Sequence, residues 1–275
     1  MMDAFAVRTI VIDGRRIAYR ATGTGPPLLC LHGYPTSSFL WRSLAPALAG
    51  ARTIIAPDLP GFGDSDLGTS SGTWEEQVSF LESFVVSLDL ASVDLVVHDW
   101  GGLIGLRWAC DRSSRVDRLV ITNTGFFPEG RWHGMAEIMR TPEAGESLMD
   151  GFTSEGFAGM MRLVCPSMPD PALAEYWKAL ATPERRAAKL ALYRSGNFAK
   201  LEAYRGRLAA LARPTLIVWG ASDRFAPAGG AVRFAREIAG SRLVLLPGVG
   251  HFLHEEAPWR TVPLIREFLT TARTR

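Results

Sequence analysis

Short apolar runs alternate with amphipathic stretches along residues 1–124. Residues 8–12 and 16–20 are predicted as two strands joined at Asp13-Gly14, a dipeptide typical of a tight hairpin turn. Further short apolar runs predict buried strands at residues 28–31, 52–56, 93–97 and 116–122. Apolar residues at helical spacing predict helices at residues 38–49, 74–88 and 103–110. The alternation is typical of a mostly parallel sheet with helices on both faces.

The pattern changes between residues 125 and 208, where the apolar strand runs disappear and helical spacing takes over. Afterwards the alternation resumes, with strands predicted at 215–219 and 243–246 and helices at 230–238 and 258–271. We therefore expect an eight-stranded α/β core formed by residues 1–124 and 209–275. A helical cap, residues 125–208, follows the sixth strand. Such an insertion usually covers a site at the carboxyl ends of the strands.

Composition narrows the class of protein. The chain has 275 residues, of which 47% are hydrophobic and 21% charged, and a net charge of +2. This is the profile of a globular protein without an electrostatic surface for nucleic acid. No apolar stretch approaches the roughly 18 residues of a membrane span, and residues 4–7 are too short for a signal peptide. Three widely spaced cysteines predict no disulfide framework. We expect a cytoplasmic monomer or homodimer whose partners are a small apolar organic substrate and water.

The run Val97-His98-Asp99-Trp100-Gly101-Gly102 carries the main chemical signal. It lies between a predicted strand and a predicted helix, where a sharp turn can raise one side chain above the sheet edge. Many enzymes have serine at this position, but a carboxylate is already anionic and can attack an sp³ carbon directly. The alternative is that Asp99 only caps the following helix. The two glycines and the aromatic residue favour a nucleophile.

Three other motifs follow predicted strands. In His32-Gly33-Tyr34-Pro35, the N–H of Tyr34 is expected to form an oxyanion hole with the N–H of Trp100. Asp223 follows the strand at 215–219, and His251 lies in a late loop. An acid in the position of Asp223 can hold the tautomer of a histidine base. No spacing typical of a metal site or a phosphate-binding loop is present, so we expect no metal and no cofactor.

At these motifs the chain resembles the α/β-hydrolase superfamily over nearly its full length. His98-Asp99-Trp100-Gly101-Gly102 resembles two subfamilies with an aspartate nucleophile, the epoxide hydrolases and the haloalkane dehalogenases. The resemblance implies a covalent alkyl-enzyme ester on Asp99. Water activated by His251, which Asp223 orients, would then hydrolyse this ester.

The two subfamilies assist the leaving group differently. Epoxide hydrolases use two cap tyrosines, for which Tyr193 is the better match and Tyr176 the nearest second candidate. Dehalogenases bind halide through the tryptophan after the nucleophile together with an asparagine, which Tyr34 replaces here, or with a second cap tryptophan. The remaining substrate-binding candidates are Trp100, Trp132, Phe152 and Phe157.

These residues favour hydrolysis of epoxides to vicinal diols over haloalkane dehalogenation. A third hypothesis is a non-catalytic ligand receptor, since some proteins with this fold have that role. Receptors of this kind usually lack a member of the triad, whereas Asp99, Asp223 and His251 are all present.

Overall fold

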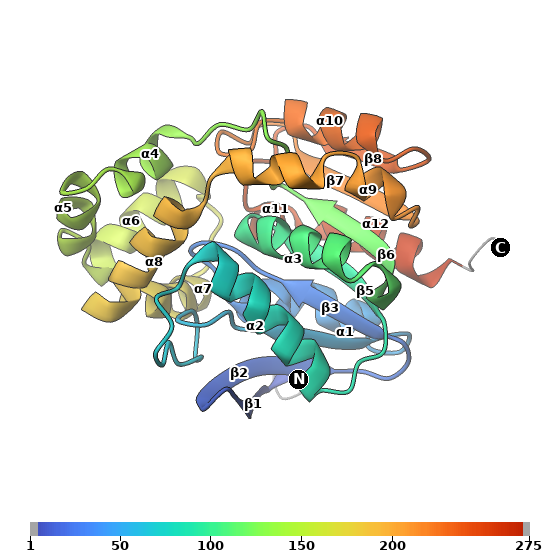
Figure 1. Cartoon of the computed structure of the whole chain (residues 1–275), viewed down its shortest axis with the longest axis horizontal. Helices are drawn as coiled ribbons and strands as arrows, with labels where there is room; N and C mark the ends of the chain where they lie inside the picture. Colours follow the sequence, from blue (N-terminus) through green and yellow to red (C-terminus); the bar gives the residue numbers. More distant parts are fainter. Residues whose placement is uncertain (1–4, 272–275) are drawn as a thin grey trace.

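The computed structural model describes residues 5–271, and a single eight-stranded sheet runs through it (Figure 1). Its strands are β1 (Val7–Ile12), β2 (Arg15–Thr22), β3 (Pro27–Leu31), β4 (Thr53–Pro57), β5 (Val93–His98), β6 (Val116–Thr122), β7 (Thr215–Gly220) and β8 (Arg242–Leu246). The spatial order is β1-β2-β4-β3-β5-β6-β7-β8. Strands β1 and β2 pair antiparallel, as do β2 and β4, and the other pairs are parallel. The predicted eight-stranded, mostly parallel sheet is confirmed.

Helices cover both faces of the sheet. They are α1 (Leu44–Leu48), α2 (Trp74–Ser87), α3 (Trp100–Asp111), α10 (Gly229–Glu237), α11 (Leu253–Glu256) and α12 (Pro258–Thr270). In Figure 1, α2 and α3 lie in front of the sheet and α1 and α12 lie behind it. The central strands β5 and β7 are buried along their whole length. The carboxyl ends of these two strands are therefore held in place by the packing around them.

The region where the cap is predicted is helical. Between β6 and β7 the chain forms α4 (Gly134–Arg140), α5 (Ala144–Asp150), α6 (Ser154–Val164), α7 (Asp170–Trp177), α8 (Pro183–Ser195) and α9 (Arg207–Ala210). Helices α4 to α8 gather at one end of the molecule, at the left of Figure 1. The division into core and cap domains stays a prediction. Within residues 5–271, no helix combines the length and the apolar character that crossing a bilayer requires.

Two local predictions had different outcomes. The hairpin is confirmed, because Asp13 and Gly14 both have positive φ angles, 51° and 75°, and Ile12 pairs with Arg15. The continuous helix at residues 38–49 is wrong. The chain forms a 3₁₀ helix over Ser38–Ser43 and then the short α1. Pro46 has no N–H to donate to a carbonyl one turn earlier, so an unbroken α-helical ladder cannot run through it.

Candidate active site

Asp99 occupies the sharp turn between β5 and α3. Its φ and ψ angles are 51° and −126°, a conformation that L-residues rarely adopt. A Cβ atom on Gly102 would lie 2.1 Å from the Thr124 hydroxyl oxygen, and one on Gly33 would lie 2.2 Å from Oδ1 of Asp99. The side chain of Asp99 accepts no N–H from the second or third residue of α3, so it does not act as a conventional helix cap.

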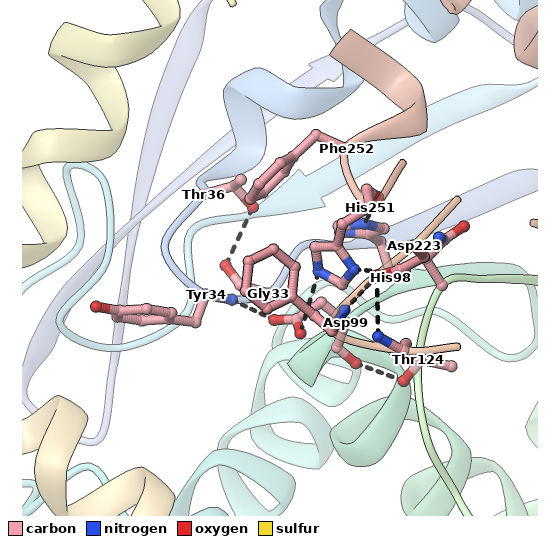
Figure 2. Close-up of polar contacts among 12 residues, drawn as sticks. Gly33, Tyr34, Thr36, His98, Asp99, Thr124, Asp223, His251 and Phe252 are labelled. Carbon is pink, nitrogen blue, oxygen red and sulfur yellow. Dashed lines mark hydrogen bonds and ion pairs between the residues drawn. The ribbon is translucent and has the colours of Figure 1, made fainter. Parts of the chain in front are cut away.

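The Asp99 carboxylate has separate partners for its two oxygens (Figure 2). The N–H of Tyr34 donates to Oδ1 at 2.6 Å, and Nε2 of His251 lies 3.5 Å from Oδ2. Burial by itself would raise the pKa of Asp99. The hydrogen bond and charge of His251 and a hydrogen bond from the backbone of Trp100 outweigh it, so the pKa lies below its ordinary value. The carboxyl group is therefore ionised, and 20% of the side chain remains exposed.

His251 connects Asp99 to Asp223. Its Nδ1 lies 2.7 Å from Oδ2 of Asp223. The other carboxylate oxygen of Asp223 accepts from the N–H groups of Phe225, at 2.7 Å, and Ala226, at 2.9 Å. Burial would lower the pKa of His251, but the charge and hydrogen bond of Asp223, followed by those of Asp99, raise it to about 10. The histidine is therefore protonated while both carboxylates are charged.

Sequence reasoning missed two residues that hold this arrangement. Asn123, directly after β6, donates to Asp223 at 2.6 Å, and its side-chain oxygen accepts the N–H of Gly220 at 3.1 Å. Glu256 accepts the N–H groups on either side of His251, from Gly250 at 2.6 Å and Phe252 at 3.0 Å. The position of Asn123 at a strand end was a usable signal. No comparable signal pointed to Glu256, because its role depends on how α11 folds back onto the loop that contains His251.

Two cavities border Asp99, with volumes of about 540 Å³ and about 50 Å³. Both are lined by Asp99, His133, Tyr193, Phe225 and His251. The larger cavity is also lined by Trp132, and the smaller by three methionines of the helical region, Met135, Met160 and Met161. An apolar substrate therefore has space directly beside the Asp99 carboxylate.

An aromatic wall stands beside these cavities. The rings of Trp100 and Trp132 stack at 5.3 Å, and Tyr193 meets their faces at 5.2 Å and 5.5 Å. Within residues 5–271, the buried Nε1 atoms of both tryptophans and the hydroxyl of Tyr34 have no hydrogen-bond partner. Burial, followed by the charge of Asp99, raises the pKa of Tyr193 well above its ordinary value. This phenol is a neutral hydrogen-bond donor.

Several predicted substrate-binding residues lie elsewhere. The Tyr176 hydroxyl donates to Glu255, so it is not available as a second proton donor at Asp99. Phe157 is fully buried against Trp177, and neither it nor Phe152 borders the two cavities. Phe157 lies on α6 and Tyr176 on α7, and both are buried in the packing of these helices, which residue type alone could not reveal.

His133 caps the N-terminus of α4. It is locally bonded, because its Nδ1 accepts the N–H of Ala136 at 3.3 Å. This bond leaves the ring proton on Nε2 when the imidazole is neutral, and burial lowers the pKa of His133. Because His133 also lines both cavities, it brings an N–H donor to the site that the sequence did not indicate.

Comparisons with known proteins identify the family. The sequence model for the alpha/beta hydrolase fold matches residues 26–258. Haloalkane dehalogenase 2 of Mycobacterium tuberculosis is 32% identical over 272 residues, which cover 92% of this chain and 91% of that protein. A haloalkane dehalogenase of Sphingobium indicum is 40% identical over 151 residues, 53% of this chain and about half of that relative, 49%. The chain belongs to the α/β-hydrolase family.

Solved structures agree with this assignment. Haloalkane dehalogenase DbeA from Bradyrhizobium elkani is 26% identical, with a TM-score of 0.85, over 96% of this chain and 97% of that one. The epoxide hydrolase CorEH is 24% identical, with a TM-score of 0.81 over 96% and 98%, and shows the fold alone. The relatives that align over more than nine tenths of both chains include haloalkane dehalogenases, and the fold is shared with an epoxide hydrolase.

Proposed function

We propose that the protein hydrolyses epoxides to vicinal diols through a covalent ester on Asp99. The Oδ2 atom of Asp99 attacks a ring carbon and the carbon–oxygen bond of the epoxide breaks. The ring oxygen takes the phenol proton of Tyr193 and becomes a hydroxyl group. The phenol is restored by the proton of His251, which leaves the imidazole neutral. Oδ1 keeps its hydrogen bond from the N–H of Tyr34, and the backbone N–H of Trp100 also donates to the carboxylate; together they hold it in position for attack.

The ester is then hydrolysed by water. His251 removes a proton from the water, whose oxygen attacks the carboxyl carbon of Asp99. The same two N–H groups stabilise the oxyanion on Oδ1. On collapse, the bond between the carboxyl carbon and the ester oxygen breaks, and this oxygen takes the proton from His251 and leaves as the second hydroxyl of the diol. Esterification removes the charge of Asp99, one of the influences that raise the pKa of His251. The first step therefore prepares the histidine to act as a base in the second.

The position of Tyr193 beside Asp99 and its neutral phenol are the main support for the epoxide assignment. The residue lines both cavities with Asp99, and its neutral phenol can donate to the ring oxygen as negative charge develops there. His133 lines the same cavities and can supply a second donor from Nε2. An alkoxide leaving group needs such donors, because it is a far stronger base than a halide.

Tyr193→Phe is expected to slow ester formation from styrene oxide by about 10²-fold, the usual contribution of one positioned acid. The substitution keeps the ring that packs on Trp100 and Tyr34, so the fold should not change. Single-turnover kinetics with rapid quenching measure the step. Leu190→Met, a buried change on the same helix, is the control. An unchanged rate in Tyr193→Phe would show that the phenol only fills space.

The indole groups favour a second candidate, haloalkane dehalogenation. The Nε1 atoms of Trp100 and Trp132 are buried without a partner among residues 5–271, and halides are bound by such N–H donors. Parallel assays separate the candidates: diol formation from styrene oxide, and bromide release from bromobutane. Turnover of bromobutane alone would replace the epoxide assignment with the dehalogenase assignment. Turnover of neither substrate would favour the hypothesis of a non-catalytic ligand receptor.

The two chemical steps are expected to differ in their response to pH. Because the pKa of Asp99 lies below its ordinary value, the carboxylate stays ionised in mild acid. Ester formation should therefore be flat between about pH 5 and about pH 8. Hydrolysis needs neutral His251, so it should slow as the pH falls, and the ester should accumulate. Rapid quenching followed by mass spectrometry measures both steps, and parallel acid losses in the two would contradict this scheme.

A further inference from the structure

The lining of the larger cavity combines aromatic and basic side chains. Among its lining residues are the aromatic side chains of Phe126, Phe127, Phe198, Phe225 and Phe234. Besides Asp99 and the protonated His251, the charged lining residues are three arginines, Arg131, Arg233 and Arg236, and one acid, Glu129. Arg131 lies directly before Trp132, and the other two arginines lie on α10.

Only one of these arginines is occupied by acidic partners. Arg233 pairs with Glu129 at 2.9 Å and with Glu237 at 2.7 Å, and it also covers the ring of Phe127 at 4.1 Å. Arg131 and Arg236 are exposed, and among residues 5–271 neither forms an ion pair. Two free guanidinium groups therefore border an aromatic cavity that leads to Asp99.

This arrangement suits a ligand with two unlike ends. The aromatic interior favours a hydrocarbon chain, because burying apolar surface is favourable. A guanidinium group matches a carboxylate in geometry and can donate two parallel hydrogen bonds to it. Both arginines are exposed, so binding an anion does not require them to be buried. The interior then determines which end of the ligand reaches Asp99.

We propose that Arg131 and Arg236 bind the carboxylate of the substrate, so that the protein acts on an apolar chain with a reactive carbon at one end and a carboxylate at the other. With the proposed epoxide chemistry, on which this inference rests, the substrate class is the epoxy fatty acids. The arginines contact the end that does not react. They therefore contribute binding energy that is equal in the ground state and the transition state, and this lowers KM without changing kcat.

The test compares ω-epoxyundecanoate with its methyl ester, a pair that differs in the charge alone. Wild-type protein should prefer the acid, and Arg131→Gln/Arg236→Gln should lower that preference about fivefold, as expected for two exposed charge pairs. The loss should appear in KM for the acid, with kcat and the methyl ester unaffected. The preference should also shrink at about 1 M salt, where the Debye length is only about 3 Å.

Arg8→Gln/Arg266→Gln removes two exposed arginines away from the cavity and is the matched control, with no expected change in preference. Calorimetric binding of undecanoate gives a second readout that needs no turnover, and its Kd should rise about fivefold in Arg131→Gln/Arg236→Gln alone. If neither epoxide is turned over, the proposed chemistry is wrong. The binding measurement still shows whether Arg131 and Arg236 bind a carboxylate. An unchanged acid preference and an unchanged Kd in that variant would overturn the inference.

Discussion

Asp99→Ala is expected to abolish turnover of every substrate, with a loss of about 10⁴-fold or more, because no other group can form the ester. The carboxylate lies between the Tyr34 N–H at 2.6 Å and His251 Nε2 at 3.5 Å. No second carboxylate in the two cavities that border Asp99 has this pair of contacts. Steady-state diol and halide assays measure the loss.

Asp99→Gly is the matched variant, because it removes the same carboxylate and also relaxes the backbone. At φ 51° and ψ −126°, a residue with a Cβ is strained, whereas glycine is not. Asp99→Gly should therefore be as inactive as Asp99→Ala but about 1 kcal/mol more stable than it in thermal unfolding. Wild-type turnover in either variant would remove Asp99 from the mechanism. Equal stability of the two would show that the turn stores no strain.

His251→Gln is expected to trap the ester. Asp99 keeps its hydrogen bonds from Tyr34 and the backbone of Trp100, so it stays ionised near neutral pH and still attacks the substrate. Hydrolysis loses its base and should slow by about 10² to 10⁴-fold. One equivalent of substrate should then react in a burst, and the mass of the protein should increase by the mass of the bound substrate.

Peptide mapping locates the adduct, which should lie on the peptide that contains Asp99. The double variant His251→Gln/Asp99→Ala is the control, since it lacks the acceptor and should show neither burst nor adduct. An adduct on another residue, or steady turnover by His251→Gln at the wild-type rate, would contradict the two-step mechanism. The experiment also tests the substrate assignment, because an epoxide adds its whole mass whereas a haloalkane loses its halide.

The positions of the strands along the chain could be predicted because the central strands are short apolar runs that end in turns. The hairpin at Asp13-Gly14 and the buried strands before Asp99 and Asp223 follow from local chemistry. The helix at residues 38–49 was not predicted correctly, because one proline interrupts an otherwise helical pattern.

The sequence by itself was sufficient to predict the central chemistry that we propose. Asp99 between two glycines and a strand, with Asp223 and His251 later in the chain, indicated a displacement at sp³ carbon followed by hydrolysis. Such motifs can be read locally because the turn needs glycine and the reaction needs a carboxylate. The parallel sheet then brings the strand ends to one edge.

Only the tertiary structure decided which side chains surround the reacting atoms. It placed Tyr193 and His133 at the cavities, directed Tyr176 to Glu255, and packed Phe157 against Trp177. The physical reason is that an amphipathic helix has one apolar pattern whether it faces a substrate cavity or another helix. The packing of α6, α7 and α8 against one another decides whether an apolar side chain faces the cavity or a neighbouring helix. This packing depends on residues that are distant in sequence.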